Sequence, residues 1–156
     1  MQPMRPGPFP RAKRSVPRVP IRTQRLRLSR EDLGDYIAFQ PRQFSCQLRY
    51  RAPHFEVNRF CWLGGQRSSI HGHRGSVCCV RVVEGTLTDT DFVRKPNGRS
   101  DEISRRRLVP GQFVTRAGSK IHRCGNEDSP GYELVSLHLY SPPLAPLSER
   151  VYGEAR

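Results

Sequence analysis

An all-β fold, a sandwich or a barrel of short strands, is the architecture that the sequence predicts. Short runs rich in Val, Ile, Phe and Tyr recur along most of the 156 residues. Such runs, separated by turns, are typical of these folds. The turns are marked by Gly, Pro and Asn, as in Gly64-Gly65, Pro96-Asn97-Gly98 and Pro110-Gly111. The length suits a single domain.

The boundaries of the expected elements follow from the same signals. Ser29 is a candidate helix N-cap followed by Asp32, with apolar residues at Leu33 and Ile37, so we predict one short N-terminal helix that ends before Pro41. The predicted strands cover residues 46–51, 54–62, 67–72, 76–84, 86–94, 102–109, 112–116, 120–124 and 132–140.

Most of the positive charge lies at the N-terminus. Residues 1–30 hold nine of the 27 Lys and Arg residues and no acid, so residues 31–156 carry 18 bases against 14 acids, a net charge of only +4. Residues 1–24 also contain six prolines, which disfavour a helix. We predict a disordered Pro/Arg-rich tail over residues 1–24 and a folded domain over residues 25–156. A non-catalytic protein that binds nucleic acid through the tail is an alternative that this distribution disfavours.

Cysteine usage and hydropathy indicate the compartment. The five cysteines are odd in number and lack the spacing of a disulfide framework, which argues against a secreted scaffold. No apolar run reaches the roughly 18 residues of a membrane span. We therefore expect a cytoplasmic monomer without a membrane partner.

A pair of histidines stands in a glycine frame in the middle of the chain. His71 and His73 are two residues apart, so on a strand both side chains would point to the same face and reach one metal ion. Gly65 precedes His71 by five intervening residues, and Gly85 follows Cys78 by six. This spacing matches the first cupin motif, with cysteine in place of its usual glutamate. It predicts a small cupin (jelly-roll) barrel.

A third metal ligand is expected from a strand that faces this pair. His122 precedes Asn126 by three intervening residues, an ending that matches the second cupin motif. The predicted metal ligands are therefore His71, His73 and His122. Zinc held by the first two histidines with Cys78 or Cys79 is an alternative, although paired Cys-x2-Cys spacings are absent.

A polar pattern near the C-terminus completes the candidate site. Ser136, His138 and Tyr140 alternate with leucines, so the three polar side chains share one face of a strand. An outward, solvated face would give the same alternation. The run Ser-Leu-His-Leu-Tyr-Ser-Pro-Pro that begins at Ser136, together with Cys61-Trp62 and Ser68-Ser69-Ile70, resembles the cysteine dioxygenase family.

This resemblance implies an oxidoreductase that uses Fe(2+) and O2 to convert L-cysteine to cysteine sulfinic acid. The three histidines would hold the iron, since neutral imidazoles suit it and leave its positive charge intact. Tyr140 would lie beside the metal, oriented by His138 and Ser136. In the family this tyrosine can be joined by a thioether bond to the cysteine at the position of Cys78.

One feature departs from the family. The family binds the substrate carboxylate with an arginine, and the best register places Cys46 at that position. A thiol cannot replace a bidentate guanidinium contact. Either Arg49, Arg51 or Arg67 compensates, or the register is wrong, or the substrate is another small thiol such as 3-mercaptopropionate. Dioxygenases of 3-mercaptopropionate carry glutamine at this arginine, and Gln47 stands one residue away from Cys46.

Overall fold

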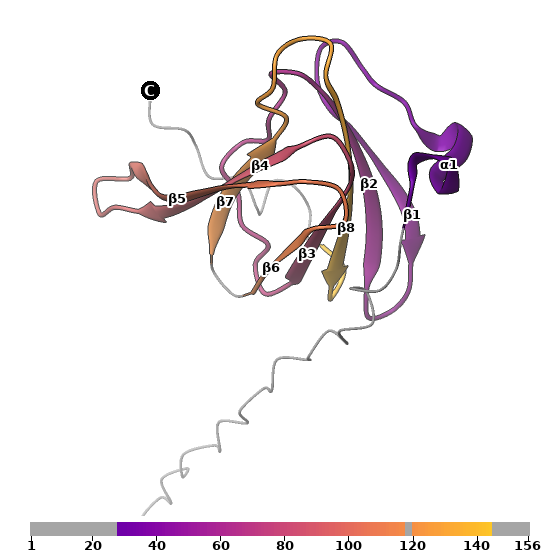
Figure 1. The fold of residues 1–156 in the computed structure, drawn as a ribbon. Coiled ribbons are helices and arrows are strands. Elements are labelled where there is room, and N and C mark those ends of the chain that lie inside the picture. The colour runs from indigo at the N-terminus through magenta and orange to yellow at the C-terminus, as the bar shows by residue number, and fades with distance from the viewer. Residues whose placement is uncertain (1–27, 118–119, 145–156) are drawn as a thin grey trace, which may run out of the picture.

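Two antiparallel β-sheets form the fold, as expected for a jelly roll (Figure 1). The computed structural model of the protein describes residues 28–117 and 120–144. One sheet has five strands in the order β1-β2-β8-β3-β6, and the other has three in the order β5-β4-β7. The strands are β1 (Ser45–Arg51), β2 (Glu56–Leu63), β3 (Val77–Glu84), β4 (Leu87–Arg94), β5 (Ser100–Leu108), β6 (Phe113–Arg116), β7 (Ile121–Gly125) and β8 (Glu133–Ser141).

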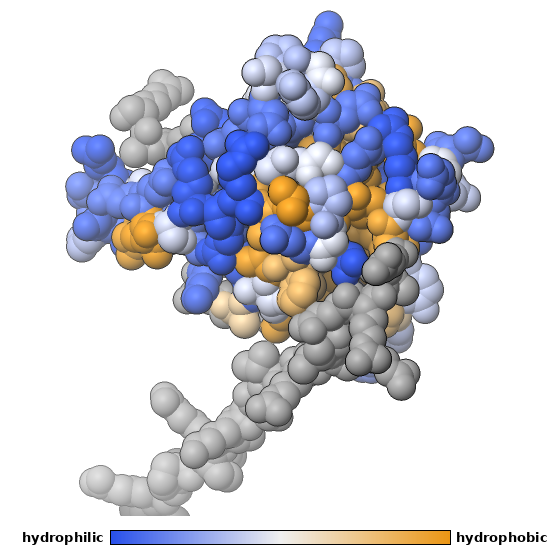
Figure 2. All heavy atoms as spheres, viewed as in Figure 1, coloured by the Kyte–Doolittle hydropathy of each residue, from blue (hydrophilic) through white to orange (hydrophobic). Residues whose placement is uncertain are grey.

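The core lies between the two sheets. Trp62, Val80 and Leu134 come from the larger sheet, and Leu87 and Cys124 from the smaller one; all are at most 2% exposed. Burial of apolar area is the main favourable term in folding. Hydrophilic residues cover most of the face seen in Figure 2, and hydrophobic residues show between them at its centre. The two antiparallel sheets and the core between them confirm the all-β prediction.

The N-terminal helix is present but shorter than predicted. It comprises α1 (Arg30–Leu33) and a 3-10 turn, η2 (Gly34–Tyr36). Ser29 and Asp32 form a capping box, in which each side chain bonds the backbone N–H of the other. Gly34, at φ 52°, ends the α-helix after one turn. Leu33 then packs against a small cluster on the outer face of the larger sheet.

The predicted strand over residues 67–72 is wrong. Only two isolated bridges form there, Arg67 with Gly125 and His71 with His122. Between them, side chains occupy backbone groups that a ladder would need: the N–H of Cys124 donates to the hydroxyl of Ser68 (3.1 Å), and the carbonyl of Ser68 accepts from Arg123 (3.1 Å). Such side-chain bonds compete with regular pairing. The other eight predicted strands are present, with ends that shift by one or two residues.

The predicted N-terminal tail cannot be compared with the structure. The proposed tail over residues 1–24 lies outside the described residues, so the division into tail and domain stays a prediction. Within the described part of the chain, no helix is long and apolar enough to cross a membrane.

Candidate metal centre

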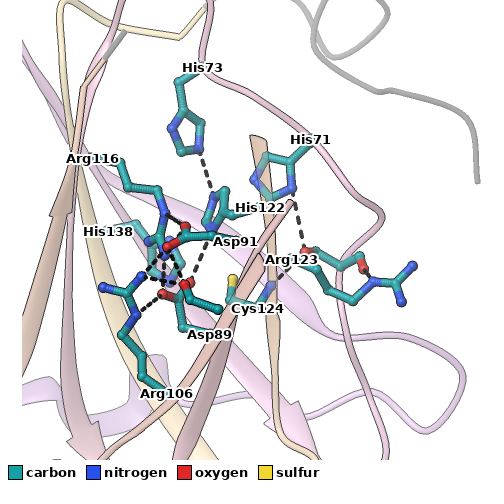
Figure 3. A network of polar contacts seen from close by, with 12 residues as sticks. His71, His73, Asp89, Asp91, Arg106, Arg116, His122, Arg123, Cys124 and His138 are labelled. Carbon is teal, nitrogen blue, oxygen red and sulfur yellow. Dashed lines mark hydrogen bonds and ion pairs between the residues drawn. The ribbon is translucent and has the colours of Figure 1, made fainter. Parts of the chain in front are cut away.

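Three histidines from two segments converge beside the core (Figure 3). His71 and His73 lie between β2 and β3, and His122 lies on β7. One ligand nitrogen from each ring lies within 4.8 Å of the others. His73 and His122 are almost completely buried, whereas His71 is half-buried. These are the three residues that the sequence predicts as metal ligands, and neither Cys78 nor Cys79 belongs to the group.

The two neighbouring histidines converge for a different reason than strand alternation. His71 is held by two reciprocal backbone hydrogen bonds to His122, each 2.8 Å long. His73 stands at the start of a turn in which the N–H of Ser76 donates to the His73 carbonyl (3.0 Å). Arg74 (φ 40°) and Gly75 (φ 95°) shape this turn. A bridge and a tight turn therefore direct the two rings to one point.

Hydrogen bonds at the far side of the rings select the nitrogen that faces the centre. The Nδ1 of His71 lies 2.9 Å from the carbonyl oxygen of Ser69, and the Nδ1 of His122 lies 3.0 Å from a carboxylate oxygen of Asp89. Both oxygens accept, so each Nδ1 carries the hydrogen and each Nε2 presents a lone pair. The Nε2 atoms of His122 and His73 lie only 3.4 Å apart. Three converging imidazoles fit a transition metal ion.

A buried cluster of charges supports His122 from below (Figure 3). Asp89 is completely buried and forms an ion pair with Arg116, which also binds Asp91 at 2.9 Å. Arg106 pairs with both carboxylates. Buried carboxylates need such partners, because an unpaired charge in the interior is strongly destabilising. Burial, followed by the nearby positive groups, lowers the pKa of His122 well below its usual range, so this ring is neutral.

Asp89 is a functional residue that was not predicted from the sequence. It lies on β4 diagonally opposite His122, since Asp91 is the residue that pairs directly with His122. Asp89 and Asp91 are two residues apart, so both face the same side of the strand. The acidic pair at alternate positions between Leu87 and Phe92 was the available signal, but only the pairing of β4 with β7 shows which side it faces.

The predicted polar face of β8 points inward and forms one continuous line of hydrogen bonds. The hydroxyl of Ser136 lies 3.0 Å from Nε2 of His138, and Nδ1 of His138 lies 3.1 Å from the phenol oxygen of Tyr140. The indole N–H of Trp62 donates to Ser136 (3.1 Å). Burial lowers the pKa of His138 and raises that of Tyr140, so both are neutral.

This line has a direction. The indole of Trp62 can only donate, so the Ser136 hydroxyl accepts from it and keeps one hydrogen and one lone pair for Nε2 of His138. In the tautomer whose Nε2 accepts from Ser136, Nδ1 of His138 carries the hydrogen and donates to Tyr140. In that tautomer the phenol hydrogen of Tyr140 is left to donate to another acceptor.

Cys78 lies opposite Tyr140 across the β3–β8 ladder. The two side chains are hydrogen-bonded, and burial raises the pKa of the Cys78 thiol well above its usual range. Cys79, the next residue on β3, faces the other side of the sheet and bonds Thr115. The structure therefore brings together the two residues that the resemblance pairs.

A cavity of about 330 Å³ opens onto these groups. Its lining residues are Phe44, Cys46, Phe60, Trp62, Arg67, Ser68, Ser69, His71, Cys124, His138 and Tyr140. Burial raises the pKa of the Cys124 thiol to about 12, so it is protonated. Trp62 stacks on Phe60 and Phe44, with ring centroids 5.5 and 4.3 Å away. His54 is exposed and does not line the cavity.

The three arginines that could replace the missing arginine of the family differ in what they contact. Cys46 pairs with Phe60, and both line the cavity. Arg49 stacks on Tyr36, with its guanidinium carbon 3.7 Å from the ring centroid. Arg51 forms an ion pair with Glu56 (3.4 Å). Of the three arginines considered, only Arg67 lines the cavity.

We expect Asp89→Asn to weaken metal binding by about 10- to 100-fold, because the amide no longer holds the His122 ring with a negative charge. The dissociation constant is measured by competition with a chelator, and the folded fraction is checked by denaturant unfolding. Asp101→Asn, which removes an exposed partner of Lys95, is the matched control. Equal affinities for the two variants would contradict the role of Asp89.

The neutral, buried His138 should make stability depend on pH. Its folded-state pKa is lowered, so the unfolded chain takes up its proton first, below a pKa of about 6.5, and the stabilisation present above that pH is lost as the pH falls. We expect His138→Gln to reduce the slope of the unfolding free energy below pH 6.5 by up to about 1.4 kcal/mol per pH unit. Urea unfolding of the metal-free protein measures it. His54→Gln should leave the slope unchanged, and an unchanged slope in His138→Gln would refute the assignment.

Comparison with known proteins agrees with this geometry. A family model described as cysteine dioxygenase type I matches residues 32–151. Cysteine dioxygenase type 1 of Rattus norvegicus and of Homo sapiens are each 39% identical over 93 residues, which cover 57% of this chain and 46% of the relative. The chain thus spans about half the length of these curated relatives.

Solved structures share the fold at low sequence identity. The protein TT1209 from Thermus thermophilus superposes with a TM-score of 0.56 at 18% identity, covering 69% of this chain and 90% of that one. A cupin superfamily protein from Desulfitobacterium hafniense gives 0.54 at 14% identity, with coverages of 67% and 83%. These likenesses show the cupin fold alone. With the family match over most of its length, the chain belongs to the cysteine dioxygenase type I family.

Proposed function

We propose that the protein is an iron(II)-dependent thiol dioxygenase that oxidises L-cysteine to cysteine sulfinic acid. One thiol and one O2 give one sulfinic acid, with both oxygen atoms bound to sulfur. The observation that carries the proposal is the position of the three histidines and of Tyr140: His71 and Tyr140 line the same cavity, and the rings of His73 and Tyr140 lie 5.2 Å apart. The family match adds to it.

The ligand set favours iron. His71, His73 and His122 would hold it through three imidazole nitrogens, a ligand type that suits iron. When bound, the metal supplies positive charge that favours the thiolate and brings the thiol and O2 together. Asp89 and the carbonyl of Ser69 keep the rings of His122 and His71 oriented for this task.

Tyr140 acts as a fixed hydrogen-bond donor. With His138 in the tautomer that carries its hydrogen on Nδ1, the phenol oxygen accepts from that nitrogen and its own hydrogen is available to another acceptor. Negative charge develops on oxygen during the reaction, and a preorganised donor stabilises it without further rearrangement. Because Tyr140 stays protonated, it can donate over the whole physiological pH range.

The aromatic wall limits access of water. Phe44, Phe60 and Trp62 form one side of the cavity, and Trp62 is completely buried. Apolar walls strengthen the electrostatic interactions between bound groups, since water screens them less. A cavity of about 330 Å³ accommodates a small thiol rather than a peptide.

We also propose that Cys78 and Tyr140 form a thioether bond. It would join Sγ of Cys78 to a ring carbon of Tyr140, with loss of one hydrogen from each. The two protons and two electrons would reduce O2 to hydrogen peroxide. Their cross-strand pairing and mutual hydrogen bond support this. The bond would hold the phenol in place.

A second candidate keeps the reaction and changes the substrate to 3-mercaptopropionate or another small thiol. Cys46 favours it: this side chain lines the cavity, and the register inferred from the sequence aligns it with the arginine of the family. The two thiols share the carboxylate and differ by the amine of L-cysteine, so the ratio of the two turnover rates distinguishes the candidates.

Oxygen uptake by protein loaded anaerobically with iron tests the function. We expect consumption of O2 with at least one of the two thiols, and a Tyr140→Phe variant whose kcat is lower by roughly a hundredfold or more. Tyr132→Phe, at an exposed tyrosine, is the matched control. Cys46→Arg should shift turnover towards L-cysteine. Iron-loaded protein that consumes no O2 with any small thiol would overturn the proposal.

Intact-mass measurement tests the thioether. After turnover with iron and O2, the protein should lack two hydrogen atoms relative to its sequence mass. Cys78→Ser should remove this difference, whereas Cys79→Ser, one residue away on the opposite face of β3, should retain it. A mass equal to that of the sequence throughout turnover would show that the bond does not form.

A further inference from the structure

Arg67 is the one side chain with a permanent charge among the described residues that line the cavity. The others are aromatic rings, thiols, two serines and two histidines, of which His138 is neutral. No Asp or Glu is among them. The described wall therefore offers a cation to a bound molecule and no anion. A ligand with a negative group would gain from this asymmetry.

The backbone of Arg67 is held rigidly against β7. The N–H of Asn126 donates to the carbonyl of Gln66, and the N–H of Ser68 donates to that of Cys124, each at 2.8 Å. Gly125 makes this approach possible, because a Cβ there would stand 2.5 Å from Cα of Arg67. The backbone at Arg67 is therefore fixed against β7, as the backbone at His71 is four residues later.

The side chain of Arg67 is available to bind a ligand. Arg67 is exposed, and its guanidinium makes no hydrogen bond, ion pair or ring contact within the described part of the chain. By contrast, Arg49 and Arg51 are engaged by Tyr36 and Glu56, and Arg123 donates to the Ser68 carbonyl. A fixed backbone with an unengaged guanidinium at the rim of a cavity suits the capture of a carboxylate, which binds it through two parallel hydrogen bonds.

We infer that Arg67 binds the anionic group of the substrate, and that the substrates are small thiols that carry a carboxylate. This inference rests on the proposed function and specifies its substrate class. Arg67 lies on the segment that carries His71. It does not lie on β1, where Cys46 supplies no positive charge. Thiols with an ammonium group and no carboxylate find no opposite charge on the described wall and would bind weakly.

Binding measured without O2 tests the inference separately from the reaction. Iron-loaded protein is titrated anaerobically with 3-mercaptopropionate, 2-mercaptoethanol and cysteamine in a calorimeter. We expect wild-type protein to bind the carboxylate thiol roughly 10- to 100-fold more tightly than either other thiol, as expected for a charge-assisted hydrogen bond. The preference should fall as salt rises, because Arg67 is exposed.

Arg67→Met should abolish the preference, and Arg67→Lys should retain part of it, since an ammonium lacks the bidentate geometry. Arg49→Met, at an arginine that does not line the cavity, should behave as wild type. Iron content and unfolding confirm that each variant is intact. A preference that survives in Arg67→Met, or that wild-type protein lacks, would overturn the inference. Absence of O2 consumption with the preference intact would overturn the proposed reaction and leave the anion site standing.

Discussion

The reciprocal backbone bridge between His71 and His122 is the contact on which the site depends. Its two hydrogen bonds join a segment without regular structure to β7 and bring together histidines that are far apart in the chain. The nitrogens that face inward are selected by acceptors beside each ring, the carbonyl of Ser69 for His71 and the carboxylate of Asp89 for His122. Without the bridge, the cluster would have two ligands instead of three.

Two different polar systems support the opposite sides of the centre. Beneath His122, charged side chains neutralise one another: Asp89 and Asp91 share Arg116 and Arg106. On β8 the groups are uncharged and satisfied by hydrogen bonds alone. The difference has a physical reason. A metal ligand benefits from a negative neighbour that fixes its tautomer, whereas a donor such as Tyr140 must keep its hydrogen, which burial ensures.

The sequence predicted the strands well where turn residues and β-branched residues coincide. Eight of the nine expected strands are present, because local pattern and sheet burial agree there. The pattern failed at residues 67–72, where Ser68 looked compatible with a strand. Its hydroxyl and carbonyl instead bond Cys124 and Arg123, which no local pattern reveals. Asp89 was missed for a related reason, since its importance comes from the diagonal relation between β4 and β7.

The sequence by itself determined the fold class, the three histidines and the Ser136–His138–Tyr140 face, because the spacing of residues along a strand or motif is a local property. Tertiary structure decided what depends on the meeting of distant segments. It distinguished Arg67 from Arg49 and Arg51, since all three are arginines near one another in sequence but only one lines the cavity. It also placed Cys46 on the cavity wall and Cys78 opposite Tyr140, as strand register is set by packing between sheets and not by any single strand.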